Sequence, residues 1–398
     1  MKTYINKIHY SNKLIFKQYV AKILLMGCTP FYTVANSFRM LLYKYNILKT
    51  HKLPAYVISI GNLTTGGTGK TPLTIAIANY IKEKLHKNVV VLSRGYGGSL
   101  SSKDVNIISN GKNILFSSKE AGDEPYLIAS KTDFTPVITG SSRIKSGLFA
   151  INDFNADILL LDDGYQHIKL YRDLNILVID AEKKFGNSLL LPAGPLREPL
   201  SMINRADKII LIDKNPNNPE KTEDIQKFAD YLKNKFNKPV FMCNFKYGDI
   251  YNIKNGEILA NSTQDDENQK IANYDKEGHD WGQYGQRHHV AAFAGIAHPE
   301  PFYNYLSQSG YNLVMTEDFT DHYMYSSQDI LRIVNQAKNL GATAIITTEK
   351  DCVKLIDIIK DLDLEIPIFA LKLEVDLDLD GLLGLWNNDT KNDEDTRC

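Results

Sequence analysis

Short apolar runs alternate with helical patterns along this 398-residue chain. The mainly apolar runs lie at residues 55–60, 89–92, 158–161, 175–180, 208–212 and 239–243. Runs without polar alternation are typical of strands that are buried on both faces of a parallel sheet. Residues 73–85, which come between the first two runs, are apolar at helical spacing and end in charged side chains. The pattern predicts an α/β fold with a doubly wound, mainly parallel sheet.

The pattern changes after about residue 245. Residues 261–289 are polar and poor in aliphatic side chains, which is typical of a mobile surface insertion. Strand-like runs return at 289–296 and 343–348 and predict a second, smaller α/β lobe. The predicted division is an N-terminal segment 1–50, a core 51–245, a C-terminal lobe 246–385 that includes the insertion, and a disordered tail 386–398.

The N-terminal segment combines apolar, aromatic and basic residues. Residues 1–54 carry nine basic residues and no acidic one, and the first carboxylate of the chain is Glu83. Between Lys22 and Arg39 lie 16 uncharged residues, fewer than the roughly 20 that span a bilayer. This pattern predicts a basic amphipathic helix, or a broken helical hairpin, that lies on an anionic membrane surface. An amphipathic helix packed on its own domain is the alternative.

Composition limits the class of protein. With 46 Lys+Arg and 47 Asp+Glu, the net charge of −1 gives the whole chain no general affinity for nucleic acid. The apolar fraction of 43% and the charged fraction of 23% exclude collagen and wholesale disorder. Four scattered cysteines form neither a CxxC motif nor a metal-binding spacing, which indicates a reducing, cytoplasmic compartment without disulfides or structural zinc.

A glycine-rich loop connects the first apolar run to the first helical segment. Its sequence is Gly61-Asn-Leu-Thr-Thr-Gly-Gly-Thr-Gly-Lys-Thr71. Strand, glycine-rich loop and helix in this order are the context of a P-loop, whose backbone N–H groups surround phosphate oxygens. Lys70 would then reach the β- and γ-phosphates of a nucleotide, and Thr71 would bind Mg²⁺. The motif normally has glycine where this chain has Thr64, and a structural glycine-rich turn is the alternative.

Two carboxylates follow the apolar run at 158–161. Asp162 and Asp163 are expected at the carboxyl end of a buried strand, where ligands bind in open α/β sheets, with Gln166 shortly after them. One of the two aspartates should lie near Mg²⁺, directly or through water, and the pattern does not decide which. An Asp-Asp-Gly turn that closes a strand is the alternative.

Three further segments carry candidate polar residues. Arg94, in Ser93-Arg-Gly-Tyr-Gly-Gly98, follows an apolar run and is a candidate for a phosphate contact. Asp123, in Gly122-Asp-Glu-Pro125, is either a base or a helix cap, and the local sequence favours the cap. Arg197 is the only cation of the proline-rich segment 189–199 and is a candidate for meeting an anionic substrate.

The motifs together resemble one family. In order along the chain they are GNLTTGGTGKTP, SRGYGG, GDEP, DDGYQH, LLPAGPLREP, GIAHP, FTDH and TEKD. This combination resembles the tetraacyldisaccharide 4'-kinase family over about residues 15–375. The resemblance implies a P-loop core, a smaller C-terminal lobe and an N-terminal helix. It further implies a peripheral protein, expected to be a monomer, on the anionic cytoplasmic face of the inner membrane.

The resemblance also implies an activity and roles for residues. The activity is transfer of the γ-phosphoryl group of ATP to the 4'-hydroxyl of a tetraacylated glucosamine disaccharide 1-phosphate, which forms lipid IVA in lipid A biosynthesis. Asp123 would act as the base, assisted by His322; the family more often has a second histidine at the position of Tyr323. The residues implied at the nucleotide phosphates are Thr64, Thr65, Gly66, Gly67, Thr68, Gly69, Lys70 and Thr71. Those implied on the side of Mg²⁺ are Thr71, Asp162, Asp163 and Gln166.

Three other classes of protein fit parts of the pattern. A membrane-recruited P-loop ATPase of the partition type would carry a second lysine early in the loop, where this chain has threonine and glycine. A GTPase would carry an N-K-x-D motif, and the nearest string here is Asn237-Lys-Pro-Val240. A lipid-binding module without enzymatic activity would leave the glycine-rich loop unexplained.

Overall fold

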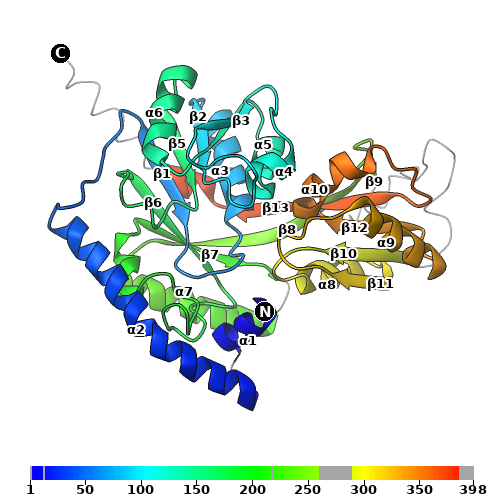
Figure 1. Cartoon of the computed structure of the whole chain (residues 1–398), viewed down its shortest axis with the longest axis horizontal. Coiled ribbons are helices and arrows are strands. Elements are labelled where there is room, and N and C mark those ends of the chain that lie inside the picture. Colours follow the sequence, from blue (N-terminus) through cyan, green and yellow to red (C-terminus); the bar gives the residue numbers. More distant parts are fainter. Residues whose placement is uncertain (1, 12–13, 217–218, 260–288, 385–398) are drawn as a thin grey trace.

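A computed structural model of the protein covers residues 2–11, 14–216, 219–259 and 289–384. Its strands belong to one continuous sheet, which passes through a larger and a smaller lobe, and a long helix runs along one side of the larger lobe (Figure 1). The predicted tail 386–398 and all of the predicted insertion except His289 lie outside the described residues.

In the larger lobe the strands are adjacent in the order β3-β4-β2-β5-β1-β6-β7-β8, and every neighbouring pair except β3–β4 is parallel. The strands are β1 (Tyr56–Gly61), β2 (Val89–Ser93), β3 (Asn106–Asn110), β4 (Pro136–Thr139), β5 (Ile158–Asp162), β6 (Leu174–Asp180), β7 (Lys208–Asp213) and β8 (Val240–Asn252). Each of the six predicted apolar runs forms one of these strands. The mixed α/β fold with a mainly parallel sheet is thereby confirmed.

Helices cover both faces of this part of the sheet because alternate strand residues point to opposite faces. Ile58 of β1 packs with Ile77 in a cluster that includes α3 (Lys70–Glu83) and α5 (Asp123–Lys131). Leu159 of β5 points the other way, into a cluster with α6 (Arg143–Phe154), and α7 (Pro219–Phe236) covers the same lobe beside β6 and β7. The short elements α4 (Ser118–Ala121) and the 3₁₀ helix η1 (Leu200–Arg205) complete the lobe.

The smaller lobe repeats this plan with parallel strands in the order β11-β10-β12-β13. Its strands are β10 (His289–Ala294), β11 (Asn312–Asp318), β12 (Ala344–Thr348) and β13 (Ile368–Leu377), and the short β9 (Ile258–Leu259) pairs with β8. Its helices are α8 (Glu300–Gln308), α9 (Ser327–Asn339) and α10 (Glu349–Ile359). Phe293 and Ala292 of β10 enter separate hydrophobic clusters, so this lobe too is packed on both faces.

Two long strands join the lobes. The start of β8 pairs with β7 in the larger lobe, and its continuation pairs antiparallel with β13 from Cys243–Leu377 to Asn252–Phe369. The boundary predicted after residue 245 therefore falls inside β8. After β13 the helix α11 (Leu379–Leu383) returns to the larger lobe, where Leu382 and Leu383 pack beneath α3. The connection between the lobes is consequently a two-stranded ribbon.

The N-terminal segment forms two helices, α1 (Lys2–Tyr10) and α2 (Phe16–Lys44). On its inner side, α2 is held by hydrogen bonds to the backbone of two sequence motifs. The Tyr32 hydroxyl donates to the Arg197 carbonyl at 2.7 Å, and the Arg39 guanidinium donates to the Gln166 carbonyl at 3.0 Å. Among the described residues, no helix has the length and apolar character required to cross a bilayer.

Candidate active site

A cleft of about 1190 Å³ lies between the lobes and beside α2. The glycine-rich loop and the end of β5 line one side of it, and residues of the smaller lobe, including His322 and Lys350, line the other. Tyr32 and Arg39 of α2 also reach the cleft. One cavity therefore connects the predicted phosphate-binding loop, the predicted base region and the N-terminal helix.

The glycine-rich loop, residues 62–69, turns the chain from β1 into α3. Gly66 and Gly69 have φ of 108° and 94°, in the region that favours glycine. A side chain at Gly69 would also lie 2.5 Å from the Phe245 ring, so this position requires glycine for both conformation and space. The loop is anchored to the proline-rich segment, since Thr65 N–H donates to the Pro195 carbonyl at 2.8 Å and Arg197 N–H donates to the Leu63 carbonyl at 2.7 Å.

Lys70 is the first residue of α3, and its ammonium points into the cleft. It donates to Asn62 Oδ1 at 3.2 Å and lies 3.5 Å from Asp163 Oδ1. Arg197 pairs with the same carboxylate at 3.0 Å. Burial alone would raise the pKa of Asp163, but Lys70 and Arg197 outweigh it and lower the pKa to about 2. Two cations and one carboxylate thus face each other where the phosphates of a nucleotide are expected.

Asp162 has a different environment from its neighbour. It is buried at the end of β5 and accepts hydrogen bonds from the hydroxyls of Thr74 and Ser93, both at 3.3 Å. Burial, with a contribution from Glu124 and Asp163, raises its pKa to about 7. Thr71 and the two aspartates all line the cleft and offer only oxygen donors, the chemistry that Mg²⁺ prefers. The residues present therefore fit a magnesium ion.

Gln166 is engaged with the loop in this arrangement. Its side-chain amide donates to the Asn62 carbonyl at 2.8 Å, and its Oε1 accepts from Arg197 at 3.4 Å. Among the described residues, no group of three or more His, Cys, Asp and Glu side chains has the geometry of a metal site. The predicted role of Gln166 beside the metal stays a prediction.

Asp123 and His322 lie together although they are 199 residues apart in the chain. His322 Nδ1 is 3.1 and 2.9 Å from the two carboxylate oxygens of Asp123. Asp123 is the first residue of α5 and Gly122 occupies the N-cap position, so the aspartate is not the helix cap that the local sequence favours. Asp123 is only 7% exposed, and His322, rather than Asp123, lines the cleft. The carboxylate therefore reaches the cleft through the imidazole.

Three charged residues that sequence reasoning did not single out surround this pair. Lys350 lies at the start of α10, Glu124 follows Asp123 on α5, and Asp321 precedes His322. We call Asp123, Glu124, Asp321, His322 and Lys350 the interlobe cluster. Burial acts to raise the pKa of Asp123, but the hydrogen bond from His322 and the charge of Lys350 bring it below its ordinary value. The available sequence signal was the motif Thr348-Glu-Lys-Asp351, which begins at the last residue of β12.

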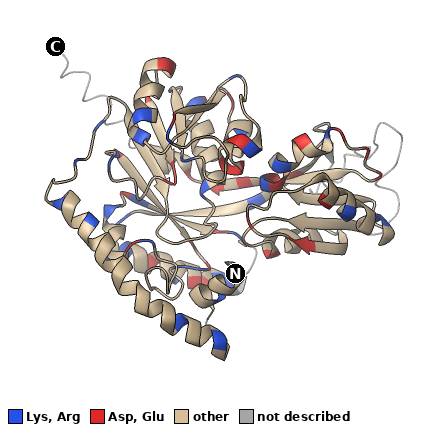
Figure 2. Ribbon diagram, viewed as in Figure 1, with Lys and Arg blue, Asp and Glu red and all other residues tan. Residues whose placement is uncertain are grey.

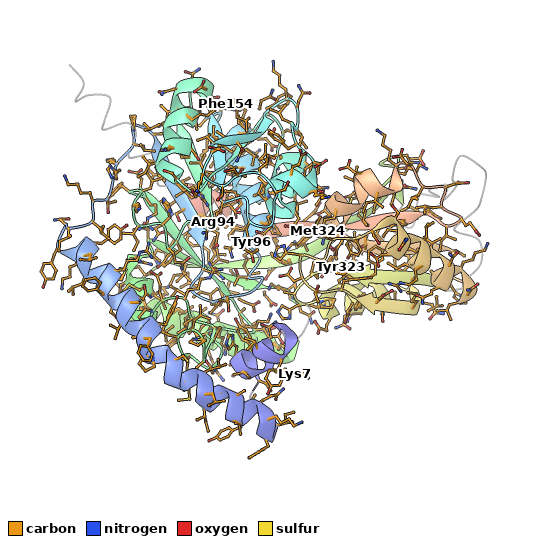
Figure 3. All side chains as sticks on the ribbon, viewed as in Figure 1. Lys7, Arg94, Tyr96, Phe154, Tyr323 and Met324 are labelled. Atoms are coloured by element: carbon orange, nitrogen blue, oxygen red, sulfur yellow. The ribbon has the colours of Figure 1, made fainter. Side chains whose placement is uncertain are left out.

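Aromatic and basic side chains complete the walls. Tyr96, on the loop after β2, packs edge-to-face with the His322 ring at 5.9 Å between centroids, and Arg94 of the same loop lines the cleft. Figure 3 labels both residues in the larger lobe, and Tyr323 and Met324 in the smaller lobe. The Tyr323 hydroxyl lies 3.4 Å from the Asp329 carboxylate, so this residue is engaged within its own lobe.

The fold and the cleft define a two-lobed α/β protein with its polar site at the carboxyl ends of parallel strands. The chain belongs to the tetraacyldisaccharide-1-P 4'-kinase family, LpxK, whose sequence model matches residues 21–385. The family predicted from the motifs is thereby confirmed.

Curated relatives and a solved structure agree with this membership. A tetraacyldisaccharide 4'-kinase of Halothermothrix orenii is 36% identical over 348 residues, which cover 87% of this chain and 86% of the relative. That of Syntrophus aciditrophicus is 37% identical over 360 residues, covering 89% and 88%. The crystal structure of the "apo" form of LpxK from Aquifex aeolicus in complex with ATP matches with a TM-score of 0.66 at 31% identity, covering 91% of this chain and 97% of that one.

Proposed function

We propose that this protein transfers the γ-phosphoryl group of ATP to the 4'-hydroxyl of a tetraacylated glucosamine disaccharide 1-phosphate and so forms lipid IVA in lipid A biosynthesis. The observation that carries the proposal is the shared cleft, in which Lys70 and His322 line opposite walls in a chain of the 4'-kinase family. The name of the relatives and the ATP of the Aquifex aeolicus structure support the same reaction.

The nucleotide side of the reaction rests on residues 64–71. Backbone N–H groups of the loop and the N-terminal end of α3 would surround the phosphates, and Lys70 would neutralise charge that develops on the transferred group. Thr71, Asp162 and Asp163 would hold Mg²⁺, which supplies further charge neutralisation when it is bound. Arg197 already pairs with Asp163 and would keep that carboxylate oriented toward Lys70.

The acceptor side rests on Asp123 and His322. Phosphoryl transfer to a hydroxyl requires the protein to accept one proton from the attacking oxygen. His322 faces the cleft and contacts Asp123 through Nδ1, so the carboxylate–imidazole pair can accept that proton while the carboxylate orients the ring. The arrangement supports the predicted use of Asp123 as base, with His322 as the member of the pair that faces the substrate.

Mass spectrometry of the acceptor lipid tests the reaction. After incubation with Mg-ATP, the disaccharide lipid should gain the mass of one phosphate. Asp123→Asn should lower the rate by about 10²–10⁴-fold, the usual contribution of a positioned base. Asp153→Asn, an exposed carboxylate on α6, serves as the matched control and should keep the full rate. No mass gain with the wild-type protein would refute the proposal, and full activity of Asp123→Asn would remove its role as base.

We also propose that α2 docks on the anionic cytoplasmic face of the inner membrane, where the acylated acceptor resides. Its outer face carries a continuous stripe of exposed apolar side chains, namely Phe16, Val20, Leu24, Phe31, Val34, Phe38 and Leu41. Phe16 and Phe31 are 81% and 79% exposed. Figure 2 shows Lys and Arg but no Asp or Glu along this helix. Such a helix would bury its apolar stripe in the interface while its basic residues meet lipid phosphates.

Vesicle flotation tests this docking. With vesicles of phosphatidylglycerol, wild-type protein should float, and Phe31→Asp/Phe38→Asp should remain largely in the soluble fraction. Phe134→Asp places the same change at a 69% exposed phenylalanine outside α2 and should float normally. Undiminished flotation of the double variant would contradict the docking face. Because one chain supplies both walls of the cleft, we further propose a peripheral, monomeric enzyme with a membrane segment 1–50, a nucleotide core 51–245 and a smaller lobe 246–385.

A further inference from the structure

The proposed reaction assigns no role to the motif Thr348-Glu-Lys-Asp351. Its lysine, Lys350, occupies the first turn of α10 and points between the lobes. Its ammonium lies 3.1 Å from Asp321 Oδ1, 3.4 Å from Glu124 Oε1 and 4.0 Å from Asp123 Oδ2. An ammonium has three N–H donors, so one side chain is shared among three carboxylates.

The three carboxylates come from both lobes. Asp123 and Glu124 belong to α5 of the larger lobe, whereas Asp321 and Lys350 belong to the smaller lobe. Three carboxylates at this spacing repel one another, and partial burial strengthens the repulsion because the local dielectric is low. Lys350 offsets this repulsion and at the same time ties α5 to the segment that carries His322.

The other polar and charged side chains in and around the cluster have further partners. From α10, Glu349 pairs with Lys131, and Lys354 pairs with the buried Asp351 at 2.7 Å. From the segment after β11, His322 Nε2 lies 3.5 Å from Asp321 Oδ2 while its Nδ1 faces Asp123. From the loop after β2, the neighbour is the Tyr96 ring. Lys350 is therefore the cation that the cluster's carboxylates share directly.

We propose that Lys350 is a positioning residue for phosphoryl transfer: its ammonium joins Asp123, Glu124 and Asp321 across the two lobes and thereby keeps the Asp123–His322 pair aligned and ready to accept a proton. The inference rests on the proposed function and adds to it a residue that acts through the pair and does not touch the phosphoryl group. The position of the two lobes would then affect the base directly, because separation of α5 from α10 would remove the Lys350 ammonium from Asp123.

The pH profile of kcat distinguishes this role from a purely structural one. Removal of a cation beside a carboxylate raises the pKa of that carboxylate, so the acid limb of the Lys350→Met profile should move to higher pH by about one unit. At a pH on that limb kcat should fall by up to about tenfold, with partial recovery in alkaline buffer. KM for ATP should be unchanged, and Lys350→Arg should restore part of kcat.

For a second variant, we expect the acid limb of the kcat profile to move in the opposite direction. Asp321→Asn removes one of the carboxylates that compete for Lys350, so its acid limb should move to lower pH. Lys246→Met, an exposed lysine on β8 paired with Asp376, is the control and should keep the wild-type profile. Thermal unfolding shows whether each variant is folded. If Lys350→Met does not fold, the pH profiles of Asp321→Asn and Lys350→Arg test the role of Lys350 in its place. A wild-type acid limb in Asp321→Asn would contradict that role.

The outcomes separate the two proposals. If wild-type protein does not phosphorylate the acceptor lipid, the proposed function fails. If wild-type protein is active while folded Lys350→Met and Asp321→Asn keep the wild-type acid limb, the positioning role of Lys350 is overturned and the proposed function stands.

Discussion

The wall of the cleft that we propose to bind phosphate is built around one short stretch of chain, residues 62–70, whereas the interlobe cluster brings together Asp123 and His322, which are 199 positions apart. In the first wall, Lys70 follows directly on the loop, and the loop is held by main-chain hydrogen bonds to the proline-rich segment. In the second, side-chain charges from two lobes hold the pair in place. The residues of the first wall belong to the larger lobe, whereas the interlobe cluster requires that both lobes pack together.

Substitutions in the two walls should therefore have different effects on nucleotide binding and on phosphoryl transfer. Damage to the loop should weaken the binding of nucleotide and abolish transfer together, because we propose that the same residues serve both. Damage to the interlobe cluster should leave the nucleotide bound and slow only the transfer. Three changes test this difference, and they are given in order of decreasing effect.

The largest effect is expected from Lys70→Ala. It removes the ammonium that we expect to face the phosphates, and loss of such a preorganised charge lowers turnover by about 10³-fold. The affinity for ATP should fall as well, as measured by titration calorimetry. Lys82→Ala, on the exposed side of the same helix, is the control and should change neither value. Near-normal ATP affinity in Lys70→Ala would contradict the expected difference between the two walls, because Lys70 would then act on transfer alone.

His322→Asn should have an intermediate effect. It removes the imidazole from Asp123 and should lower kcat by about 10²-fold, while the affinity for ATP stays at the wild-type value. Asparagine suits the φ of 65° at this position, so the backbone should not be strained. His86→Asn is a matched control, since His86 is an exposed histidine with φ of 51°. A parallel loss of ATP affinity in His322→Asn would show that the two walls are not independent.

Tyr10→Phe should have the smallest effect, and it removes a contact with the glycine-rich loop of the first wall. The Tyr10 hydroxyl of α1 donates to the Thr65 carbonyl of the loop at 2.7 Å. Loss of one neutral hydrogen bond costs about 1 kcal/mol of stabilisation of the loop. KM for ATP should therefore rise by about fivefold at most, with little change in kcat. Tyr19→Phe, at an exposed position on α2, should have no effect. A change in kcat without a change in KM would mean that α1 does not act through the loop.

Much of the first wall could be predicted from local sequence. The apolar runs became strands because residues such as those of β5, Ile158–Asp162, are buried on both sides of the sheet. The glycines at 66 and 69 were visible because a turn with positive φ selects for glycine. The contrast between Asp162 and Asp163 was not visible, since two adjacent carboxylates differ only through what surrounds them, hydroxyls for the first and cations for the second.

The interlobe cluster could not be predicted from the local sequence. The sequence around Asp123 favoured a helix cap, and the partner that gives the residue another role lies on the far lobe. Lys350 stood in a recognisable motif at a strand end, but nothing in its surroundings along the chain shows that three carboxylates converge on it. The ribbon of β8 and β13, which brings the lobes together, was hidden for the same reason, since its two strands pair across more than a hundred intervening residues.

What the sequence determined by itself was the α/β class, the buried strands, the glycine-rich loop and the family. These depend on burial and backbone preferences that act over a few neighbouring residues. The tertiary structure alone placed distant parts of the chain together: Asp123 beside His322, Lys350 beside three carboxylates, and α2 against the backbone of the site. The physical reason is that charges and hydrogen bonds act over a few ångströms in space, and distance along the chain does not report that proximity.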